Sequence, residues 1–337
     1  MPRIQEVDDS AMCISRKKKG RGFSFYAEDG VKIEDKKNLK RLKNLVIPPM
    51  WTQVFICRFD DGHIQATGRD LKGRKQYIYH STYEKQRQEM KFKKMLHFAD
   101  HLPKIRKRAY TDLKLKTWEK KKLLALIILI LDEYGIRIGN KQYRNKNETF
   151  GLTTLRRKHL KIDEEELIFQ YKGKSNQERE VHIDDEQLIP FIKEVASLPG
   201  YEIFRYRDTD GSFQDLDSDE VNDYIATFMG EEFSSKDFRT WAGSRLGIEC
   251  YQEALKSETR NNRKKFSNIV IKMVAEELGN TPTVCKNYYV HPAVFNAIEK
   301  KEIKNPNPFK NTSSKYKLTA SERLAYEIIK ESYAGNS

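Results

Sequence analysis

Alternating apolar and polar residues mark the first part of the chain and predict a series of short β-strands. Turn-forming sequences such as Asp60-Asp61-Gly62 separate the expected strands, which are residues 23–26, 54–57, 63–67 and 76–79. One helix is expected near residues 36–45, and Pro48-Pro49 excludes a helix directly after it. The pattern therefore predicts a small, mainly β N-terminal domain over residues 1–85.

Helical spacing replaces this alternation in the rest of the chain. The most apolar stretch, residues 123–131, is expected to be a buried helix that ends near Gly139-Asn140. Further helices are expected over residues 85–99, 186–197, 217–229, 235–246, 249–257, 263–278, 292–301 and 319–334. The pattern predicts a larger, mainly helical domain over residues 86–337.

Two β segments interrupt this helical part. Residues 167–171 and 178–183 flank the sequence Gly173-Lys174-Ser175-Asn176, which predicts a hairpin with a glycine-bearing turn. The expected fold class is therefore α+β, with a mainly β N-terminal domain and a mainly α domain into which one β hairpin is inserted.

Positive charge gives the first indication of a partner. The chain holds 63 Lys and Arg against 49 Asp and Glu, for a formal net charge of +14. Such a surplus fits nucleic acid first and an anionic membrane second, with solubility alone as the plain alternative. The stretch 123–131 is too short to span a bilayer, which weakens the membrane interpretation. Basic residues concentrate at residues 16–21, where a mobile arm or the edge of a basic patch is expected, and at residues 104–122.

Metal, nucleotide and disulfide chemistry find no support in the motifs. The four cysteines form no Cys-x-x-Cys pair, which favours a reducing, cytoplasmic location, and no secretory signal is expected. The chain contains neither a phosphate-binding loop with the Walker spacing nor a His-Glu-x-x-His motif. The acidic segment 208–219 fits a solvated turn better than a calcium loop. No metal and no cofactor are therefore expected.

Four residues in distinctive local sequences suggest one chemical hypothesis: Arg137, Lys174, Arg239 and Tyr289. A tyrosine is a weak nucleophile at neutral pH because its ordinary pKa is about 10. Fixed positive groups around a phosphate would stabilise the charge that develops when the tyrosine oxygen attacks. Arginine can donate two hydrogen bonds to phosphate oxygens, and lysine can protonate the departing oxygen.

Local sequence gives each of the four residues a defined position. Arg137 follows the buried helix, Lys174 lies at the hairpin tip, Arg239 begins a helix, and Tyr289 follows a proline-containing turn. Each also has a plain interpretation. An arginine beside an apolar helix is often a structural ion pair, a lysine in a turn is often only solvated, and Tyr289 could pack in the core.

Longer segments resemble the signature of type IB DNA topoisomerases of the bacterial and poxvirus branch. They occur in order and cover nearly the whole chain: Gly68–Tyr79, Arg137–Asn140 with Asn147–Leu155, Lys236–Trp241 and Gly279–Tyr289. The resemblance implies a catalytic domain of the topoisomerase IB and tyrosine recombinase type. It implies that supercoiled duplex DNA is relaxed through single-strand cleavage, a 3′-phosphotyrosyl intermediate, strand rotation and religation, without ATP or metal.

The resemblance also implies the role of each catalytic residue. Tyr289 would be the nucleophile, Arg137 and Arg239 would hold the phosphate, and Lys174 would be the general acid, helped by Arg137. Counting from Lys286 along the family's Ser-Lys-x-x-Tyr pattern selects Tyr289 rather than Tyr288.

Two positions depart from the family pattern. The serine of that pattern is Cys285 here, and many members have histidine where this chain has Asn280. An asparagine can donate a neutral hydrogen bond to a phosphate oxygen but contributes no positive charge. Asn280 therefore stays in the expected catalytic set, with an electrostatic deficit that the other residues must cover.

A second set of residues is expected to contact double-stranded DNA. In the resembling family the segment that corresponds to Gly68–Tyr79 contacts the major groove. A glutamine can pair with a base edge and tyrosine hydroxyls can bind phosphate. The expected set is Arg69, Lys72, Arg74, Gln76, Tyr77, Tyr79, Lys236 and Lys286. The residues themselves leave open whether Tyr77 or Tyr79 packs inward.

The two domains are expected to form a monomeric clamp around duplex DNA. Two alternatives stay open: a tyrosine recombinase or integrase with the same chemistry, and a duplex DNA-binding protein without catalysis. The expected location is the cytoplasm. In a bacterium the protein would be associated with the nucleoid, and for a virus it would lie in the virion or the host cell.

Overall fold

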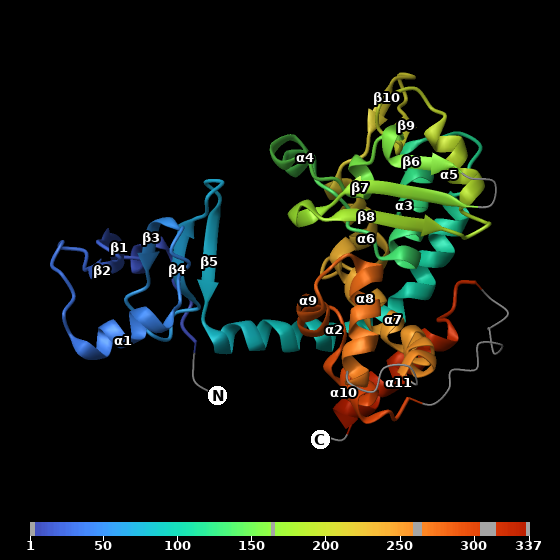
Figure 1. Cartoon of the computed structure of the whole chain (residues 1–337). Coiled ribbons are helices and arrows are strands. Elements are labelled where there is room, and N and C mark those ends of the chain that lie inside the picture. The colour runs from blue at the N-terminus through green and yellow to red at the C-terminus, as the bar shows by residue number, and fades with distance from the viewer. Residues whose placement is uncertain (1–3, 163–165, 259–264, 304–314, 335–337) are drawn as a thin grey trace. The chain divides into compact units, whose positions relative to one another are not determined.

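The computed structural model describes residues 4–162, 166–258, 265–303 and 315–334 (Figure 1). The chain divides into two compact units, residues 1–93 and 94–337, and the division falls inside helix α2 (Ser81–Asp112). The expected domain boundary at residue 85 lies in the same helix.

The N-terminal unit is built on one antiparallel sheet in the order β2-β1-β3-β4-β5. The strands are β1 (Ile14–Lys19), β2 (Gly22–Tyr26), β3 (Thr52–Ile56), β4 (Ile64–Arg69) and β5 (Lys75–Tyr79). Helix α1 (Lys36–Asn44) begins at Asp35, whose side chain accepts from the Asn38 N–H at 2.8 Å. It places Leu42 in a core with Phe25, Val54, Ile56 and Ala66. The expected mainly β unit with one helix is confirmed.

The expectation of a mobile arm is wrong for residues 14–19, which form β1 and pair with both β2 and β3, whereas the alternative of a basic patch edge stays a prediction. Lys17, Lys18 and Lys19 of this strand are exposed, which explains their charge. Arg16 is half-buried and directs its side chain at the segment before β3. Its guanidinium donates to the carbonyls of Ile47, Pro48 and Trp51 at 2.8, 2.9 and 3.0 Å.

The C-terminal unit is mainly helical. After α2 its helices are α3 (Lys120–Tyr134), α4 (Lys141–Asn147), α5 (Ile189–Ala196), α6 (Ser218–Met229), α7 (Ser235–Glu258), α8 (Phe266–Leu278), α9 (Pro282–Tyr288), α10 (Pro292–Lys300) and α11 (Ala320–Ala334). Helix α3 is buried from Lys122 to Leu131, which fits its unbroken apolar sequence, and it packs against α6 and α7.

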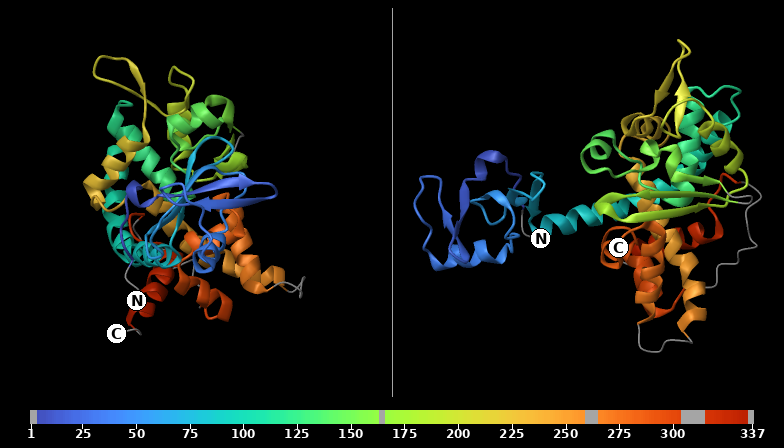
Figure 2. Two further views of the ribbon diagram at one scale, coloured as in Figure 1. Left: turned by 90° about the vertical axis from the view of Figure 1, so that its left-hand side faces the viewer. Right: turned by 45° about the horizontal axis from the view of Figure 1, so that its top comes forward.

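A three-stranded antiparallel sheet in the order β6-β7-β8 completes this unit, with a small β9–β10 pair. The strands are β6 (Leu160–Ile162), β7 (Leu167–Lys172), β8 (Glu178–Ile183), β9 (Arg205–Arg207) and β10 (Phe213–Asp215). The sheet lies at one end of the unit and α10 and α11 at the other (Figures 1 and 2). The expected hairpin is confirmed as β7–β8.

Two expected boundaries are wrong. Helix α3 ends at Tyr134, where Gly135 adopts the left-handed conformation (φ 56°), rather than at Gly139-Asn140. Helix α7 is continuous, whereas two helices were expected, because Gly247 lies inside it against Val294 and Ile298 of α10. The strongly basic stretch 104–122 includes the end of α2 at residues 104–112. Within the described residues, no helix is long and apolar enough to cross a membrane.

Candidate functional site

The carboxyl end of α8 collects the guanidinium groups of three arginines that lie far apart in the sequence, here called the arginine cluster: Arg137, Arg179 and Arg239. Arg179 donates to the Glu276 and Glu277 carbonyls at 2.9 and 2.8 Å, Arg239 to the Leu278 carbonyl at 2.5 Å, and Arg137 to the Gly279 carbonyl at 3.2 Å and to Asn280 Oδ1. The last carbonyls of a helix lack partners within it and carry partial negative charge. They can therefore hold cations without a carboxylate.

Arg137 lies in the loop after α3, and its backbone is fixed by a second loop. The Arg137 carbonyl accepts from the Leu152 N–H at 2.8 Å. Gly139 and Gly151 approach so closely that a Cβ on Gly151 would lie 2.5 Å from the Gly139 nitrogen. Glycine is needed at residue 151 for this contact. Arg137 is thus held both at its backbone and at its guanidinium.

Arg239 and Tyr289 meet beside α7. The Arg239 guanidinium carbon lies 5.1 Å from the centroid of the Tyr289 ring. Gly243 lies one turn after Arg239, and a Cβ there would come within 2.7 Å of the Tyr289 carbonyl oxygen. A larger residue at 243 would push the tyrosine away from α7. The half-buried Tyr289 follows a short helix, α9, rather than the expected simple turn, because Thr281 and Pro282 begin a helix there.

Within the part of the chain that the structure describes, the arginine cluster has no carboxylate partner. The salt bridges among the described residues that involve arginine include none of its three members. Burial lowers the pKa of Arg137. Burial, and then the positive charge of Arg137, lower the pKa of Arg239. Burial and the neighbouring positive charge both disfavour the charged form of these arginines. An anion bound here would offset both and would therefore be stabilised by all three guanidinium groups.

Two buried donors in this region lack an acceptor: Arg239 Nε and Asn280 Nδ2. The orientation of Asn280 follows from its other atom, because Oδ1 accepts from Arg137 and Nδ2 is therefore the donor of the amide. A buried donor without a partner is destabilising by roughly 1–3 kcal/mol. Donors of this kind beside uncompensated positive charge fit a ligand rich in oxygen acceptors, such as a phosphate.

Cys285 occupies the position of the family's serine and is fully buried under the cluster. Burial raises the pKa of its thiol to about 11. The thiol is therefore neutral near pH 7 and contributes packing rather than a nucleophile.

Lys174 lies in the turn between β7 and β8, and its side chain is exposed. The turn is tight, with Ser175 and Asn176 at φ 63° and 58°. Figures 1 and 2 show the turn on the same side of the C-terminal unit as α9. The structure thus brings together Arg137, Arg239, Asn280 and Tyr289, whereas Lys174 lies at the hairpin tip.

Arg179 is a member of the cluster that sequence reasoning missed. In β8, residues 179, 181 and 183 are buried and residues 178, 180 and 182 are exposed. The arginine therefore occupies a position in the strand's apolar phase, where a charged residue calls for an explanation. An arginine at a buried position of an alternating strand was therefore the sequence signal that could have identified Arg179.

The other two basic residues expected to contact DNA in this unit are exposed. Lys236 lies in the first turn of α7, three positions before Arg239. Lys286 lies on α9, and its ammonium group is 4.1 Å from the centroid of the Phe295 ring.

In the N-terminal unit, Asp70 organises part of the expected DNA-binding set. Its carboxylate pairs with Arg74 at 2.7 Å and accepts from the Gln76 amide at 2.9 Å. Arg69 donates to the Gln53 side chain and to the Gly73 carbonyl, both at 2.7 Å. Lys72 is exposed in the same turn. The Gln76 amide is therefore held by Asp70 in this structure.

Tyr77 and Tyr79 lie on the same face of β5 and stack, with ring centroids 6.0 Å apart and planes inclined by 17°. Ile78 points the other way and packs against the core of the N-terminal unit. Tyr77 is 42% exposed and Tyr79 is half-buried. Neither ring packs inward with the core, which answers the question that the sequence left open.

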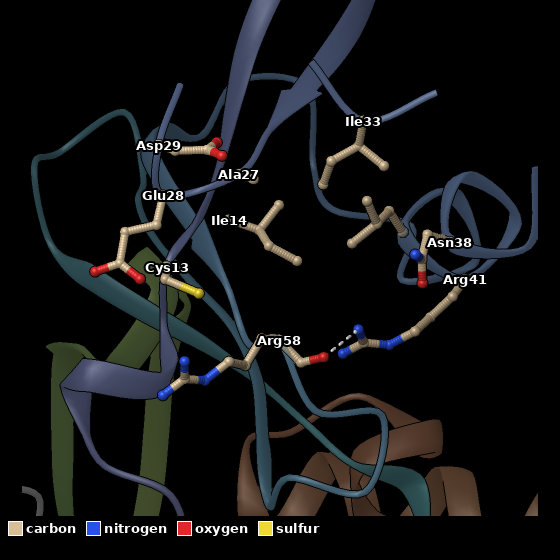
Figure 3. A pocket seen from close by; sticks show the side chains of 10 residues that line it. Cys13, Ile14, Ala27, Glu28, Asp29, Ile33, Asn38, Arg41 and Arg58 are labelled. Atoms are coloured by element: carbon tan, nitrogen blue, oxygen red, sulfur yellow. Dashed lines mark hydrogen bonds between the residues drawn. The ribbon is translucent and has the colours of Figure 1, made fainter. Parts of the chain in front are cut away.

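A separate open pocket in the N-terminal unit contains none of the expected site residues (Figure 3). Cys13, Glu28 and Arg58 are among its lining residues, and Arg41 donates to the Arg58 carbonyl at 3.2 Å. Among the residues that the structure describes, no group of three or more His, Cys, Asp or Glu side chains could hold a metal ion.

Comparisons with known proteins agree with the geometry. Residues 80–316 match the family described as "Eukaryotic DNA topoisomerase I, catalytic core", and residues 22–70 match "Bacterial DNA topoisomerase IB, N-terminal domain". DNA topoisomerase 1B of Acanthamoeba polyphaga mimivirus is 32% identical over 284 residues, covering 82% of this chain and 84% of that protein. DNA topoisomerase 1B of Vaccinia virus (strain Copenhagen) is 25% identical over 239 residues, covering 70% and 73%.

Among solved structures, the XerH site-specific recombinase bound to difH substrate is similar at a TM-score of 0.32 and 16% identity, covering 65% of this chain and 55% of that one. That likeness is too weak to carry an argument. The family matches span most of both units, and the family's signature segments supply Arg137, Arg239, Asn280 and Tyr289. The chain belongs to the type IB DNA topoisomerase family.

Proposed function

We propose that the protein relaxes supercoiled duplex DNA by cutting and resealing one strand through Tyr289. The observation that carries the proposal is the arginine cluster, which is buried at Arg179 and Arg239 and has no carboxylate partner among the described residues, with Tyr289 packed against Arg239. A buried cation without a carboxylate is costly to a fold unless a ligand compensates it. A backbone phosphate of DNA supplies that charge.

Arg137, Arg239 and Asn280 would hold the phosphate. The unpartnered Arg239 Nε and Asn280 Nδ2 are available to its nonbridging oxygens. These donors would stabilise the additional charge of the pentacoordinate transition state, which is the main means of catalysis at such sites. Asn280 contributes a neutral hydrogen bond, so the positive charge comes from the arginines.

Tyr289 would form the new bond and Lys174 would complete the exchange. The Tyr289 oxygen attacks phosphorus and its phenolic proton passes to solvent, the bond from phosphorus to the 5′ oxygen breaks, and Lys174 gives that oxygen a proton, with help from Arg137. The product is a 3′-phosphotyrosyl bond and a free 5′ hydroxyl. After the nicked strand has rotated, the 5′ hydroxyl attacks back and releases Tyr289.

This exchange needs neither ATP nor a metal, because one phosphodiester is traded for another. The charge stabilisation that a metal would supply is assigned to the guanidinium groups. We propose that a monomer performs it, with the domain of residues 1–85 and the domain of residues 86–337 holding the duplex as a clamp. The protein would act in the compartment that holds its DNA, which is the cytoplasm and nucleoid of a bacterium, or a virion or host cell for a virus.

DNA contacts outside the cleavage site would come from two groups of residues. In the N-terminal unit they are Arg69, Lys72, Arg74, Gln76, Tyr77 and Tyr79, and in the C-terminal unit Lys236 and Lys286. The exposed cations among them fit contacts to phosphate. Binding should then weaken with salt, by roughly 0.9 log unit per log unit of salt for each phosphate neutralised.

The test is relaxation of a supercoiled plasmid in EDTA without ATP, together with trapping on a suicide duplex. Wild type should relax the plasmid and form a denaturation-resistant adduct. Tyr289→Phe should do neither while still binding DNA, and Tyr288→Phe, a change in the exposed neighbour, should do both. Products that are joined or inverted rather than relaxed would favour a recombinase. The absence of any adduct from wild type would refute the catalytic proposal.

A further inference from the structure

Arg179 connects the β7–β8 hairpin to the end of α8. We propose that Arg179 is a positioning residue that fixes the hairpin, and with it the turn bearing Lys174, relative to the phosphate site. The proposal rests on the proposed function, because it assigns Arg179 a role through the general acid. It concerns no direct contact between Arg179 and DNA.

On the α8 side, Arg179 is held by two hydrogen bonds and by close packing. Its Nη1 and Nη2 donate to the Glu276 and Glu277 carbonyls at 2.9 and 2.8 Å. A Cβ on Gly279 would lie 2.4 Å from Cδ, Nε and Cζ of Arg179. The guanidinium of Arg179 therefore lies against Gly279, the residue before Asn280. The carbonyl of the same glycine accepts from Arg137.

On the hairpin side, the stem of Arg179 packs under the turn. A Cβ on Gly173 would lie 3.0 Å from Arg179 Cγ, and Gly173 immediately precedes Lys174. The Gly173 N–H donates to the Gln177 carbonyl at 2.8 Å, which closes the turn. Across the hairpin, Arg179 pairs with Tyr171, which is also buried. One side chain thus touches both the base of the turn and the end of α8.

What sets Arg179 apart from Arg137 and Arg239 is its contact with the hairpin: its terminal nitrogens donate to α8 carbonyls while its stem packs on Gly173. Lys174 itself is exposed, and its long side chain has many rotamers. The region from which its ammonium can reach a 5′ oxygen depends on where the turn is held. A displacement of about 1 Å in a catalytic group can cost about 100-fold in rate.

The chemistry offers a way to isolate this role. In a duplex whose scissile 5′ oxygen is replaced by sulfur, attack by Tyr289 forms the same bond and breaks the phosphorus–sulfur bond. The leaving thiolate needs no proton, because an ordinary thiol has a pKa of about 8.5 whereas an alkoxide must be protonated. A defect that acts through Lys174 should disappear on this substrate, and a defect in phosphate binding should persist.

The experiment measures single-turnover cleavage of matched duplexes with a 5′ oxygen or a 5′ sulfur at the scissile bond. Arg179→Ala should slow cleavage of the oxygen duplex about 10- to 100-fold and leave the sulfur duplex within about threefold of wild type. Lys174→Ala should show the same pattern more strongly. In the double variant, Arg179→Ala should add no further loss to Lys174→Ala.

Two further variants guard the interpretation. Arg179→Lys keeps one donor and should lie between wild type and Arg179→Ala on the oxygen duplex; it carries the test if thermal unfolding shows that the alanine variant does not fold. Glu180→Ala changes the outward neighbour on β8, which bonds Gln170 and His182, and should leave both rates unchanged.

Equal slowing of Arg179→Ala on both duplexes, additivity with Lys174→Ala, or a wild-type rate on the oxygen duplex would overturn the proposal. Failure of wild type to form an adduct on either duplex would instead refute the proposed function. The two failures are therefore distinguishable.

Discussion

Helix α7 carries two buried arginines in opposite electrostatic surroundings. Arg245 bonds Glu249 at 3.2 Å and lies 3.8 Å from Glu133. Burial alone would lower its pKa, but the charges of Glu249 and Glu133 outweigh burial and raise it. Arg239, a turn and a half earlier, donates to the carbonyls of Gly135 and Leu278, and burial lowers its pKa.

The same contrast separates two larger groups. Arg106 is matched by Asp132 and Glu322, each at 2.6 Å, and Glu322 also accepts from the Trp241 indole at 2.9 Å. This network, here called the paired network (Arg106, Asp132, Glu322), joins α2, α3 and α11. Its one cation is paired with two carboxylates of the protein itself. The cations of the arginine cluster have no carboxylate partner among the described residues, which favours a partner from outside.

The largest expected effect is on the stability of the paired network. Arg106→Ala leaves Asp132 and Glu322 buried without their cation, which should lower the free energy of unfolding by about 3–5 kcal/mol. Urea denaturation measures it. The control is Lys272→Ala, which breaks an exposed pair with Glu276 and should cost at most about 1 kcal/mol. If both variants lost the same free energy of unfolding, Arg106 would not have the structural role that sets it apart from the arginine cluster.

Arg239→Ala should reduce the cleavage rate strongly and the stability only modestly, the opposite of Arg106→Ala. Cleavage should slow about 100- to 1,000-fold because a transition-state donor is lost. The free energy of unfolding should fall less than in Arg106→Ala, since no buried carboxylate is left unpaired. Single-turnover cleavage and denaturation on the same preparations decide it. Arg245→Lys, on the same helix, serves as the control and should keep the cleavage rate within about threefold of wild type.

An added anion should stabilise the arginine cluster in the absence of DNA. Inorganic phosphate at ten times its dissociation constant should raise the free energy of unfolding by about 1.4 kcal/mol in wild type. The gain should vanish in Arg239→Ala and persist in Lys272→Ala. Chloride at equal ionic strength controls for screening. A phosphate effect of the same size in Arg239→Ala would show that the anion binds elsewhere.

The smallest expected effect concerns pH and a buried histidine close to α7. His291 caps α10 and accepts from Ala293, and burial lowers its pKa to about 4. The lowered pKa means that His291 stabilises the fold above the unfolded value near 6.5 and loses this contribution as pH falls. Between pH 7.5 and 5.5 the loss should be about 1 kcal/mol. His291→Asn keeps a capping side chain and should remove this part of the pH dependence, whereas an unchanged pH profile would contradict the assignment.

Local patterns sufficed for the elements whose periodicity is strong. The apolar stretch 123–131 of α3, the alternating β8 and the glycine-bearing hairpin turn are all predicted by the sequence. The end of α3 and the continuity of α7 were not, because they depend on Gly135 and Gly247 meeting other elements. A glycine that ends a helix and one that allows close packing look alike in sequence.

The site divides in the same way. Motif resemblance selected Arg137, Arg239, Asn280 and Tyr289, which the structure brings together. Nothing in the sequence predicted that α8 carbonyls would hold the arginines, since those groups belong to the backbone. Arg179 was missed because its role depends on contacts with Gly173 and Gly279, more than a hundred residues apart in the chain. The catalytic roles of these residues, and of Lys174, stay predictions.

The most direct measurement is mass spectrometry of the adduct trapped on a suicide duplex in EDTA without nucleotide. The account predicts one modified peptide, with the DNA-derived phosphate on Tyr289. Modification of the exposed Tyr288, of another residue, or of none would contradict the claim that the arginine cluster presents a phosphate to Tyr289.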